Sequence, residues 1–157
     1  MLLILSAHNM AIWQYHFILV PAASIDTVNF DDFQTSDGLV DDERFWTVFP
    51  MDVSAFMPIK TFIPQKQSWS ENIVQFGELD KSCCEIFMED QRVVSVRFRV
   101  DFTSDYSSLL DSMIEFCLFN GISILDEHLS SVPLNALAIA LLMQDSPQFH
   151  MMNKLRR

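Results

Sequence analysis

The length, composition and charge of this sequence describe one small acidic domain and exclude several functions. The 157 residues are enough for a single hydrophobic core, and a hydrophobic fraction of 50% with 14 Phe is typical of a folded globular protein. The formal net charge is -11, and no cluster of Lys and Arg could displace the counterions of a nucleic acid. Anionic lipid headgroups would repel an acidic surface. We therefore expect neither a nucleic-acid partner nor a membrane partner.

The N-terminal part is expected to hold a loose extension, 1–9, before a single domain, 10–157, and Met1 and Met10 are both candidate start residues. No Lys or Arg precedes Arg44, which argues against a secretory leader. Three cysteines without a repeated spacing argue against a disulfide framework. A cytoplasmic protein with reduced thiols is the expectation.

The first predicted strand covers 12–20, which is rich in aromatic and β-branched residues and stops at Pro21. Because both of its faces are largely apolar, we expect it inside a sheet and not at an edge.

The segment 31–43 predicts an exposed acidic loop, since it carries six carboxylates, no cation and a chain-breaking Gly38. An acidic surface of this kind suits a basic protein partner. The residues that we expect to bind it are Asp31, Asp32, Asp37, Asp41, Asp42 and Glu43.

The segment 44–64 combines many aromatic residues with prolines at 50, 58 and 64. Prolines at this spacing forbid a long helix or a central strand. We expect irregular structure that anchors the core through its aromatic side chains.

Three strands are predicted over 72–79, 83–89 and 93–102, with a hairpin turn at 89–92. The third strand alternates apolar and polar residues with a period of two, which indicates one face toward the core and one polar face.

Helices are predicted after these strands. The first is capped by Ser104 or Asp105, buries Leu109, Leu110, Met113, Ile114, Cys117 and Leu118, and ends at Asn120-Gly121. A short strand over 122–125 follows. The second helix begins near Ser131 and Pro133 and buries Leu134, Leu137, Ala138, Leu141 and Leu142, and the last begins at Ser146-Pro147.

This order of elements predicts an α+β fold: an antiparallel sheet of about four to five strands, built as a meander, with two to three helices packed on one face.

Most catalytic and cofactor chemistry is excluded by missing motifs. The three glycines are far apart, so a phosphate-binding or dinucleotide-binding loop is absent. The loop around Gly38 lacks calcium ligands at its first and twelfth positions, and no His or Cys pair has a zinc spacing. His128 beside Glu127 is interpreted as a surface residue. We expect no enzyme, no cofactor and no metal.

One group of polar residues has two interpretations. Arg97, Arg99 and Asp101 stand in a row on the third strand of the meander, where two guanidinium groups could read an anion in a small-ligand or enzymatic site. The favoured interpretation is a set of ion pairs with Glu85 or Glu89 of the neighbouring strand.

Scattered motifs resemble an uncharacterised family of small bacterial proteins with no established activity. They are Trp13-x-Tyr15, Pro64-x-x-x-Ser68-Trp69-Ser70, Gly77, the hairpin acids before Arg92-Val93, Arg97-x-Arg99-x-Asp101 and Asp145-Ser146-Pro147-x-Phe149. The chain departs from that family at Asp90-Gln91, where members usually have glycine. Its size and acidity are also similar in type to immunity proteins that neutralise toxins.

The expected function is a non-catalytic protein-binding domain, for which that similarity implies an immunity-like role. A small-ligand or enzymatic site at the arginine row is the first alternative. A homodimer built on the exposed sheet face or on the aromatic segment 45–62 is the second.

Overall fold

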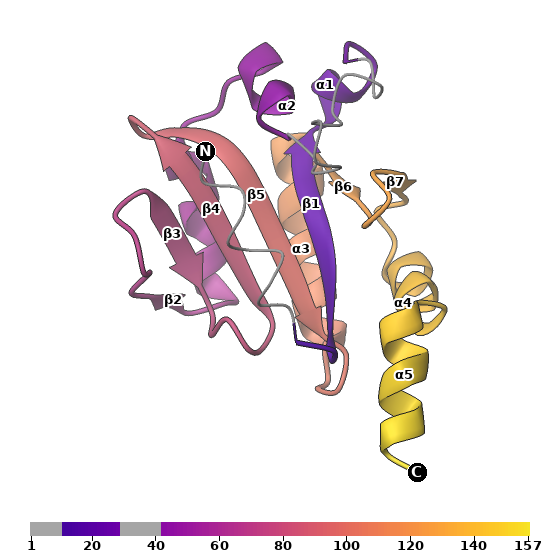
Figure 1. Cartoon of the computed structure of the whole chain (residues 1–157). Coiled ribbons are helices and arrows are strands. Elements are labelled where there is room, and N and C mark those ends of the chain that lie inside the picture. Colours follow the sequence, from indigo (N-terminus) through magenta and orange to yellow (C-terminus); the bar gives the residue numbers. More distant parts are fainter. Residues whose placement is uncertain (1–10, 29–41) are drawn as a thin grey trace, which may run out of the picture.

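A computed structural model describes residues 11–28 and 42–157 and places their strands in one antiparallel sheet (Figure 1). The fold is α+β, as the sequence predicts, but the described residues form seven strands and six helices, and not four to five strands and two to three helices. The strands are β1 Gln14–Pro21, β2 Gln65–Lys66, β3 Ile73–Phe76, β4 Cys83–Glu89, β5 Arg92–Asp101, β6 Ile122–Leu125 and β7 Ser131–Val132. Their spatial order is β2-β3-β4-β5-β1-β6-β7.

The first strand lies in the interior of the sheet, as its two apolar faces predict. β1 pairs with β5 on one side and with β6 on the other, both antiparallel. The strands β2 to β5 form the predicted meander, and β1 adds to the last of them. Sequence patterning missed β2 and β7, because two-residue strands carry no periodicity.

The hairpin between β4 and β5 has the predicted position and an unusual turn. Its two central residues, Asp90 and Gln91, have φ of 50° and 67°, the left-handed region that a two-residue hairpin of type I′ requires. Glycine usually occupies such positions because it has no Cβ. Gly77 does so at the end of β3, where φ is 81° and an added Cβ would lie 2.5 Å from the Ser82 carbonyl oxygen. This shortens the predicted strand 72–79 to β3.

Two short helical elements replace the irregular structure expected for 44–64. α2 covers Glu43–Val48, and the 3₁₀-helix η2 covers Val53–Thr61 with Pro58 inside it. The predicted aromatic anchoring is confirmed for Phe45, Trp46 and Phe56, which are buried. A third short helix, α1 Ala22–Ile25, follows β1 and contacts α2.

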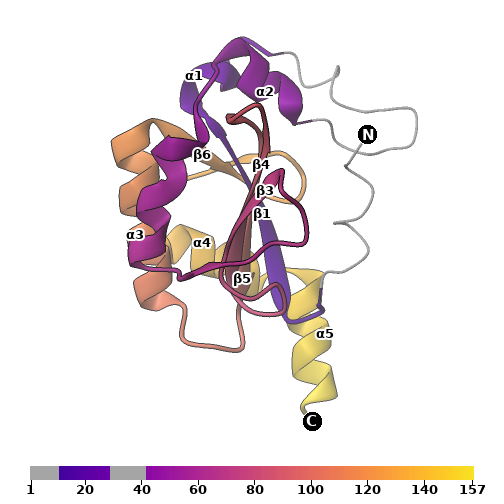
Figure 2. The ribbon, with the colours of Figure 1, turned by 90° about the vertical axis from the view of Figure 1, so that its left-hand side faces the viewer.

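The helix α3, Ser107–Asn120, packs on the same side of the sheet as η2 (Figure 2). It ends at Gly121 with φ of 65°, as predicted. Its N-cap position is Tyr106, so neither predicted cap holds that position, although the Asp105 carboxylate accepts the Ser107 backbone N–H. Leu118 is exposed and was wrongly placed in the buried stripe.

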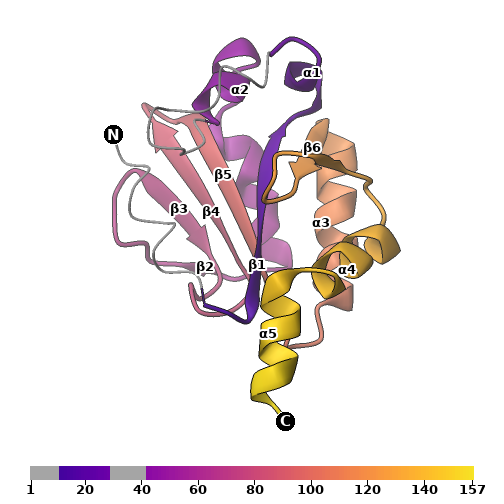
Figure 3. The same ribbon diagram turned by 45° about the vertical axis from the view of Figure 1, so that its right-hand side comes forward.

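The C-terminal helices α4, Ala136–Gln144, and α5, Pro147–Leu155, lie beyond β6 and the end of β1 (Figure 3). Asn135 caps α4, so the helix starts later than predicted, and Ser131 belongs to β7. The predicted buried stripe was wrong for Leu137 and Leu141, which are exposed, whereas Leu134 and Leu142 pack against the core. When apolar residues occur on every side of a helix, the sequence does not indicate which side is buried. The start of α5 at Ser146-Pro147 is confirmed.

No helix in the described part of the chain combines the length and the apolar character needed to cross a bilayer.

Candidate functional site

The polar face of β5 is buried. Arg97 is 8% exposed and Arg99 is 3% exposed, although alternation along the strand suggested a solvated side. The strand register places Glu85 of β4 opposite Arg97 and His16 of β1 opposite Arg99. A period of two identifies which residues share a face, but not whether water reaches that face.

The Arg97 guanidinium interacts with Asp42 and Ser95. Arg97 Nη2 lies 3.0 Å from Asp42 Oδ1, and Arg97 Nε donates to Ser95 Oγ at 3.2 Å. The Ser95 hydroxyl donates in turn to Asp42 Oδ2 at 2.7 Å. Asp42 is fully buried just before α2. Its predicted role as a partner-binding residue is therefore wrong, because its carboxylate neutralises an internal arginine.

The second arginine forms the predicted cross-strand pair. Arg99 Nη2 lies 3.3 Å from Glu85 Oε1, and both side chains are almost completely buried. Burial raises the pKa of Glu85, while Arg99 opposes this shift. Since Arg97 pairs with Asp42 and not with Glu85 or Glu89, the prediction holds for one arginine of the two.

His16 shares this buried face and is held neutral. Burial, followed by the charges of Arg97 and Arg99, lowers the pKa of His16 to about 3. Its Nε2 atom has no hydrogen-bond partner, and neither has Nε of Arg99. The face is thus a set of internal ion pairs with a neutral imidazole beside them.

Asp101, the third residue of the predicted row, forms hydrogen bonds within the turn that follows β5. The Asp101 carboxylate accepts hydrogen bonds from the backbone N–H and the hydroxyl of Thr103, at 2.9 and 2.6 Å. It orders the turn after β5 and does not join the two arginines.

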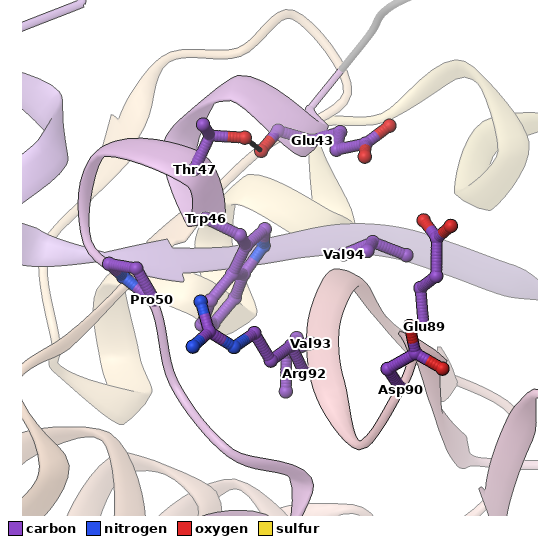
Figure 4. A pocket seen from close by; sticks show the side chains of 9 residues that line it. All are labelled: Glu43, Trp46, Thr47, Pro50, Glu89, Asp90, Arg92, Val93 and Val94. Atoms are coloured by element: carbon purple, nitrogen blue, oxygen red, sulfur yellow. Dashed lines mark hydrogen bonds between the residues drawn. The ribbon is translucent and has the colours of Figure 1, made fainter.

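A pocket of about 350 Å³ lies between α2 and the β4–β5 hairpin (Figure 4). Three carboxylates and one cation contribute to its lining. The lining residues are Glu43, Trp46, Thr47, Pro50, Glu89, Asp90, Arg92, Val93 and Val94. Among these residues, sequence analysis gave a partner-binding role only to Glu43.

Backbone pairing fixes the two walls of this pocket relative to each other. The chain after α2 runs beside the hairpin, where Val53 N–H donates to the Gln91 carbonyl at 2.8 Å and Val93 N–H donates to the Met51 carbonyl at 3.0 Å. Arg92 forms a β-bridge with Asp52 and lowers the pKa of that carboxyl group, although hydrogen bonds from Ser54 lower it more. The hairpin acids are therefore presented on a fixed backbone.

Trp46 forms part of the pocket wall and carries an unused donor. The side chain is 2% exposed, its ring contacts Phe56 with centroids 5.8 Å apart, and its Nε1 atom has no hydrogen-bond partner. Figure 4 shows the indole reaching from α2 toward Arg92 and Val93, with Glu43 above it and Glu89 and Asp90 beside it. A buried N–H without an acceptor is costly, and this atom is also out of reach of solvent in the folded protein.

The three cysteines are buried and carry free thiols. Burial raises the pKa of the Cys83 and Cys117 thiols to about 12 and raises that of Cys84 as well. His128 is exposed, in agreement with its interpretation as a surface residue. Within residues 11–28 and 42–157, no group of three or more His, Cys, Asp or Glu could hold a metal ion.

Four of the predicted partner-binding residues, Asp31, Asp32, Asp37 and Asp41, lie outside the described residues. Glu43 lies at the rim of the pocket and is exposed. The hairpin acids could have been recognised from sequence, because an Asp-Gln turn without glycine still places Asp90 in the turn and Glu89 at the end of the strand before it.

Comparison with known proteins gives no match: no family model, no curated protein and no solved structure is significantly similar to this chain. The resemblance to a family of small bacterial proteins therefore stays a prediction.

Proposed function

We propose that this chain is a non-catalytic protein-binding domain that uses an acidic surface to bind a basic protein. The observation that carries the proposal is the lining of the pocket between α2 and the hairpin, where Glu43, Glu89 and Asp90 outnumber the single cation Arg92. The overall charge of -11 acts in the same direction, because it attracts a cationic partner over a distance. Toxin neutralisation of the immunity type is one function that such a surface could serve.

The alternative small-ligand or enzymatic site at the arginine row has less support. A site that reads an anion needs guanidinium donors that are accessible and uncompensated. Arg97 and Arg99 each have a buried carboxylate within 3.3 Å, and Asp101 is used by its own turn. Binding an anion there would require breaking two internal ion pairs.

The proposal is tested with a partner isolated by co-purification from the native host and identified by mass spectrometry. Its association rate is then measured with the wild type and with D31N/D32N/D37N at several salt concentrations. We expect the variant to associate about tenfold more slowly at low salt, with a flatter salt dependence, because steering depends on net surface charge. The control D111N/E115Q removes two exposed acids of α3 and should slow association less. A partner that is not basic, or a rate that D31N/D32N/D37N leaves unchanged, contradicts the proposal.

Self-association is a second candidate, and exposed apolar side chains favour it. Phe119 is 90% exposed and Leu137 is 68% exposed, and Leu118 and Leu141 are also exposed. Large exposed apolar side chains are typical of interaction surfaces when they are contiguous. The aromatic segment 45–62 is less suitable, because Phe45, Trp46 and Phe56 are buried in the core. Light scattering decides: a monomer mass at high protein concentration rules out the homodimer.

A further inference from the structure

We propose that another pocket, beside β3, receives one Arg side chain of the basic protein partner, which stacks on the indole of Trp69. This inference rests on the proposed function and names a contact that would hold the partner. The pocket has a volume of about 480 Å³ and lies between the β2–β3 and β3–β4 connections, near one edge of the sheet (Figure 1). Its lining residues are Gln67, Ser68, Trp69, Gln75, Glu78, Leu79 and Asp80.

Trp69 offers an accessible aromatic face to this pocket. The side chain is 51% exposed, whereas Trp46 is 2% exposed. Trp69 forms a hydrogen bond with Glu85 that lowers the pKa of this carboxyl group, although burial raises that pKa more and Arg99 lowers it more. The indole is therefore held at its N–H while much of its ring remains accessible. A planar cation is a suitable ligand, because the negative face of an aromatic ring attracts positive charge.

Gln75 supplies an acceptor that the protein leaves unused. The residue is 5% exposed, and its Nε2 atom donates to the Gly77 carbonyl at 2.8 Å. Within the described residues its Oε1 atom has no hydrogen-bond partner, and it is not one of the fully buried atoms that lack one, so it stays accessible. A ligand that fills the pocket should donate to this oxygen, because covering it without a hydrogen bond would cost free energy.

The other polar groups of the pocket favour a ligand that donates and does not accept. The Ser68 hydroxyl donates to a backbone carbonyl 2.6 Å away, and Glu78 pairs with Lys66 at 3.4 Å. Asp80 is exposed, and in the part of the chain that the structure describes its carboxylate has no ion pair. The free groups of Gln75 and Asp80 are thus both acceptors. An Arg guanidinium has five donors, no acceptor and a planar shape, whereas a Lys ammonium is a compact charge that cannot stack.

The pocket wall that carries Asp80 is fixed before any ligand binds. The Gln14 side chain is fully buried in β1, and its Nε2 atom donates to the carbonyls of Leu79 and Lys81 at 2.8 and 2.6 Å. Trp13 Nε1 donates to the Asp80 carbonyl at 2.8 Å. A preformed wall reduces the ordering cost of binding.

The test uses three blocked tripeptides, acetyl-Gly-X-Gly-amide, in which X is Arg, citrulline or Lys. Citrulline has the shape of Arg without its charge, and Lys has the charge without the planar group. Isotope-labelled full-length protein is titrated, and the three indole N–H signals are followed by NMR, with W69F identifying the Trp69 signal by its loss. We expect a saturable shift of the Trp69 signal with the Arg peptide, weaker binding of the Lys peptide and no saturable shift with citrulline.

Substitutions then locate the binding. W69L removes the aromatic face and D80N removes the free charge, so each should weaken binding of the Arg peptide about fivefold or more, which corresponds to about 1 kcal/mol. The backbone N–H signals of 78–80 report binding to W69L. The matched controls F119L and D111N change an exposed aromatic and an exposed acid of α3 and should bind as the wild type does.

Several results would overturn the inference. They are an unchanged Trp69 signal, citrulline binding as tight as Arg binding, and a control that loses as much affinity as its matched variant. Methyl β-glucoside is titrated as well, because a sugar also combines hydroxyl donors with an apolar face. Tighter binding of this sugar than of the Arg peptide would assign the pocket to a carbohydrate and overturn the inference.

The partner assay separates this inference from the proposed function. The dissociation rate of W69L decides the inference, because losing a close contact acts mainly on dissociation. The association rate of D31N/D32N/D37N decides the proposed function, because steering by surface charge acts on association. If W69L releases the isolated partner at the wild-type rate while D31N/D32N/D37N binds more slowly, the inference fails and the proposed function stands. If neither variant changes binding, both fail.

Discussion

The buried face of β5 and the pocket at the hairpin contain the same residue types and use them differently. On the buried face, each arginine has its own carboxylate at 3.0 or 3.3 Å, and the charges cancel inside the protein. In the pocket, three carboxylates and one arginine line a space of about 350 Å³ that remains open. The difference teaches that a row of charged side chains stabilises the fold when the opposite charges come from the same sheet and from the helix beside it. Charged side chains become candidates for binding a partner where the backbone leaves the carboxylates at the edge of a pocket.

The largest predicted effect comes from breaking the buried network at Arg97. The substitution R97M leaves the Asp42 carboxylate buried without its cation, and removing one partner of a buried pair costs about 3–5 kcal/mol. Unfolding in urea measures this loss. The rim substitutions E89Q/D90N should change the free energy of unfolding by less than about 0.5 kcal/mol, as surface changes usually do.

A second variant keeps this comparison informative if R97M does not fold. R97M/D42N removes both charges and leaves an amide that can still accept from Ser95, so it should be more stable than R97M alone. If R97M costs under about 1 kcal/mol, the network is not the buried, mutually dependent group that the distances indicate.

The next effect is the pH dependence of stability, which His16 should dominate on the buried face. Its pKa is lowered to about 3 in the folded protein, so between pH 6.5 and 3 the unfolded chain binds the extra proton. The contribution of His16 to stability is therefore complete above about pH 6.5 and is lost as the pH falls, by up to about 1.4 kcal/mol per pH unit. The substitution H16Q should flatten the slope.

The titration of Glu85 changes stability with pH in the opposite direction to the titration of His16. Its pKa is raised in the folded protein, so its protonation at falling pH favours the folded state and opposes His16. Because H16Q retains Glu85, the difference between the two slopes belongs to His16. Equal slopes for wild type and H16Q from pH 6.5 to 4.5 contradict the neutral buried imidazole.

The smallest effect concerns the strained turn in the pocket wall. Gln91 has φ of 67°, which costs a residue with a Cβ about 1–2 kcal/mol. The substitution Q91G should raise the free energy of unfolding by about 0.5–1 kcal/mol after the entropy cost of glycine is subtracted. Thermal unfolding measures the gain. Q91A keeps the Cβ and should show none.

Sequence patterns predicted the centre of the fold well. The strands β4 and β5, the end of α3 at Gly121 and the capping of α5 at Ser146 all follow from local signals that act within a few residues. The interior position of β1 also followed, because its two apolar faces have no other stable placement.

The candidate site could not be predicted in the same way, because it depends on pairings between distant residues. Nothing near Asp42 in the sequence indicates that it turns inward to meet Arg97, since the two are joined only by the docking of α2 on β5. The same docking brings Trp46 beside the hairpin. For α4, the continuous apolar sequence hid the fact that Leu137 and Leu141 face outward.

The position of β1 in the interior of the sheet has a consequence for synthesis of the chain. Among the described strands β1 comes first in the sequence, but both of its neighbours, β5 and β6, are encoded far downstream. Until the chain has been made through Asp101, an apolar strand with two open edges has no native partner. Because pairings of such long sequence separation form slowly, this segment is where a nascent or refolding chain should first bind a chaperone or aggregate.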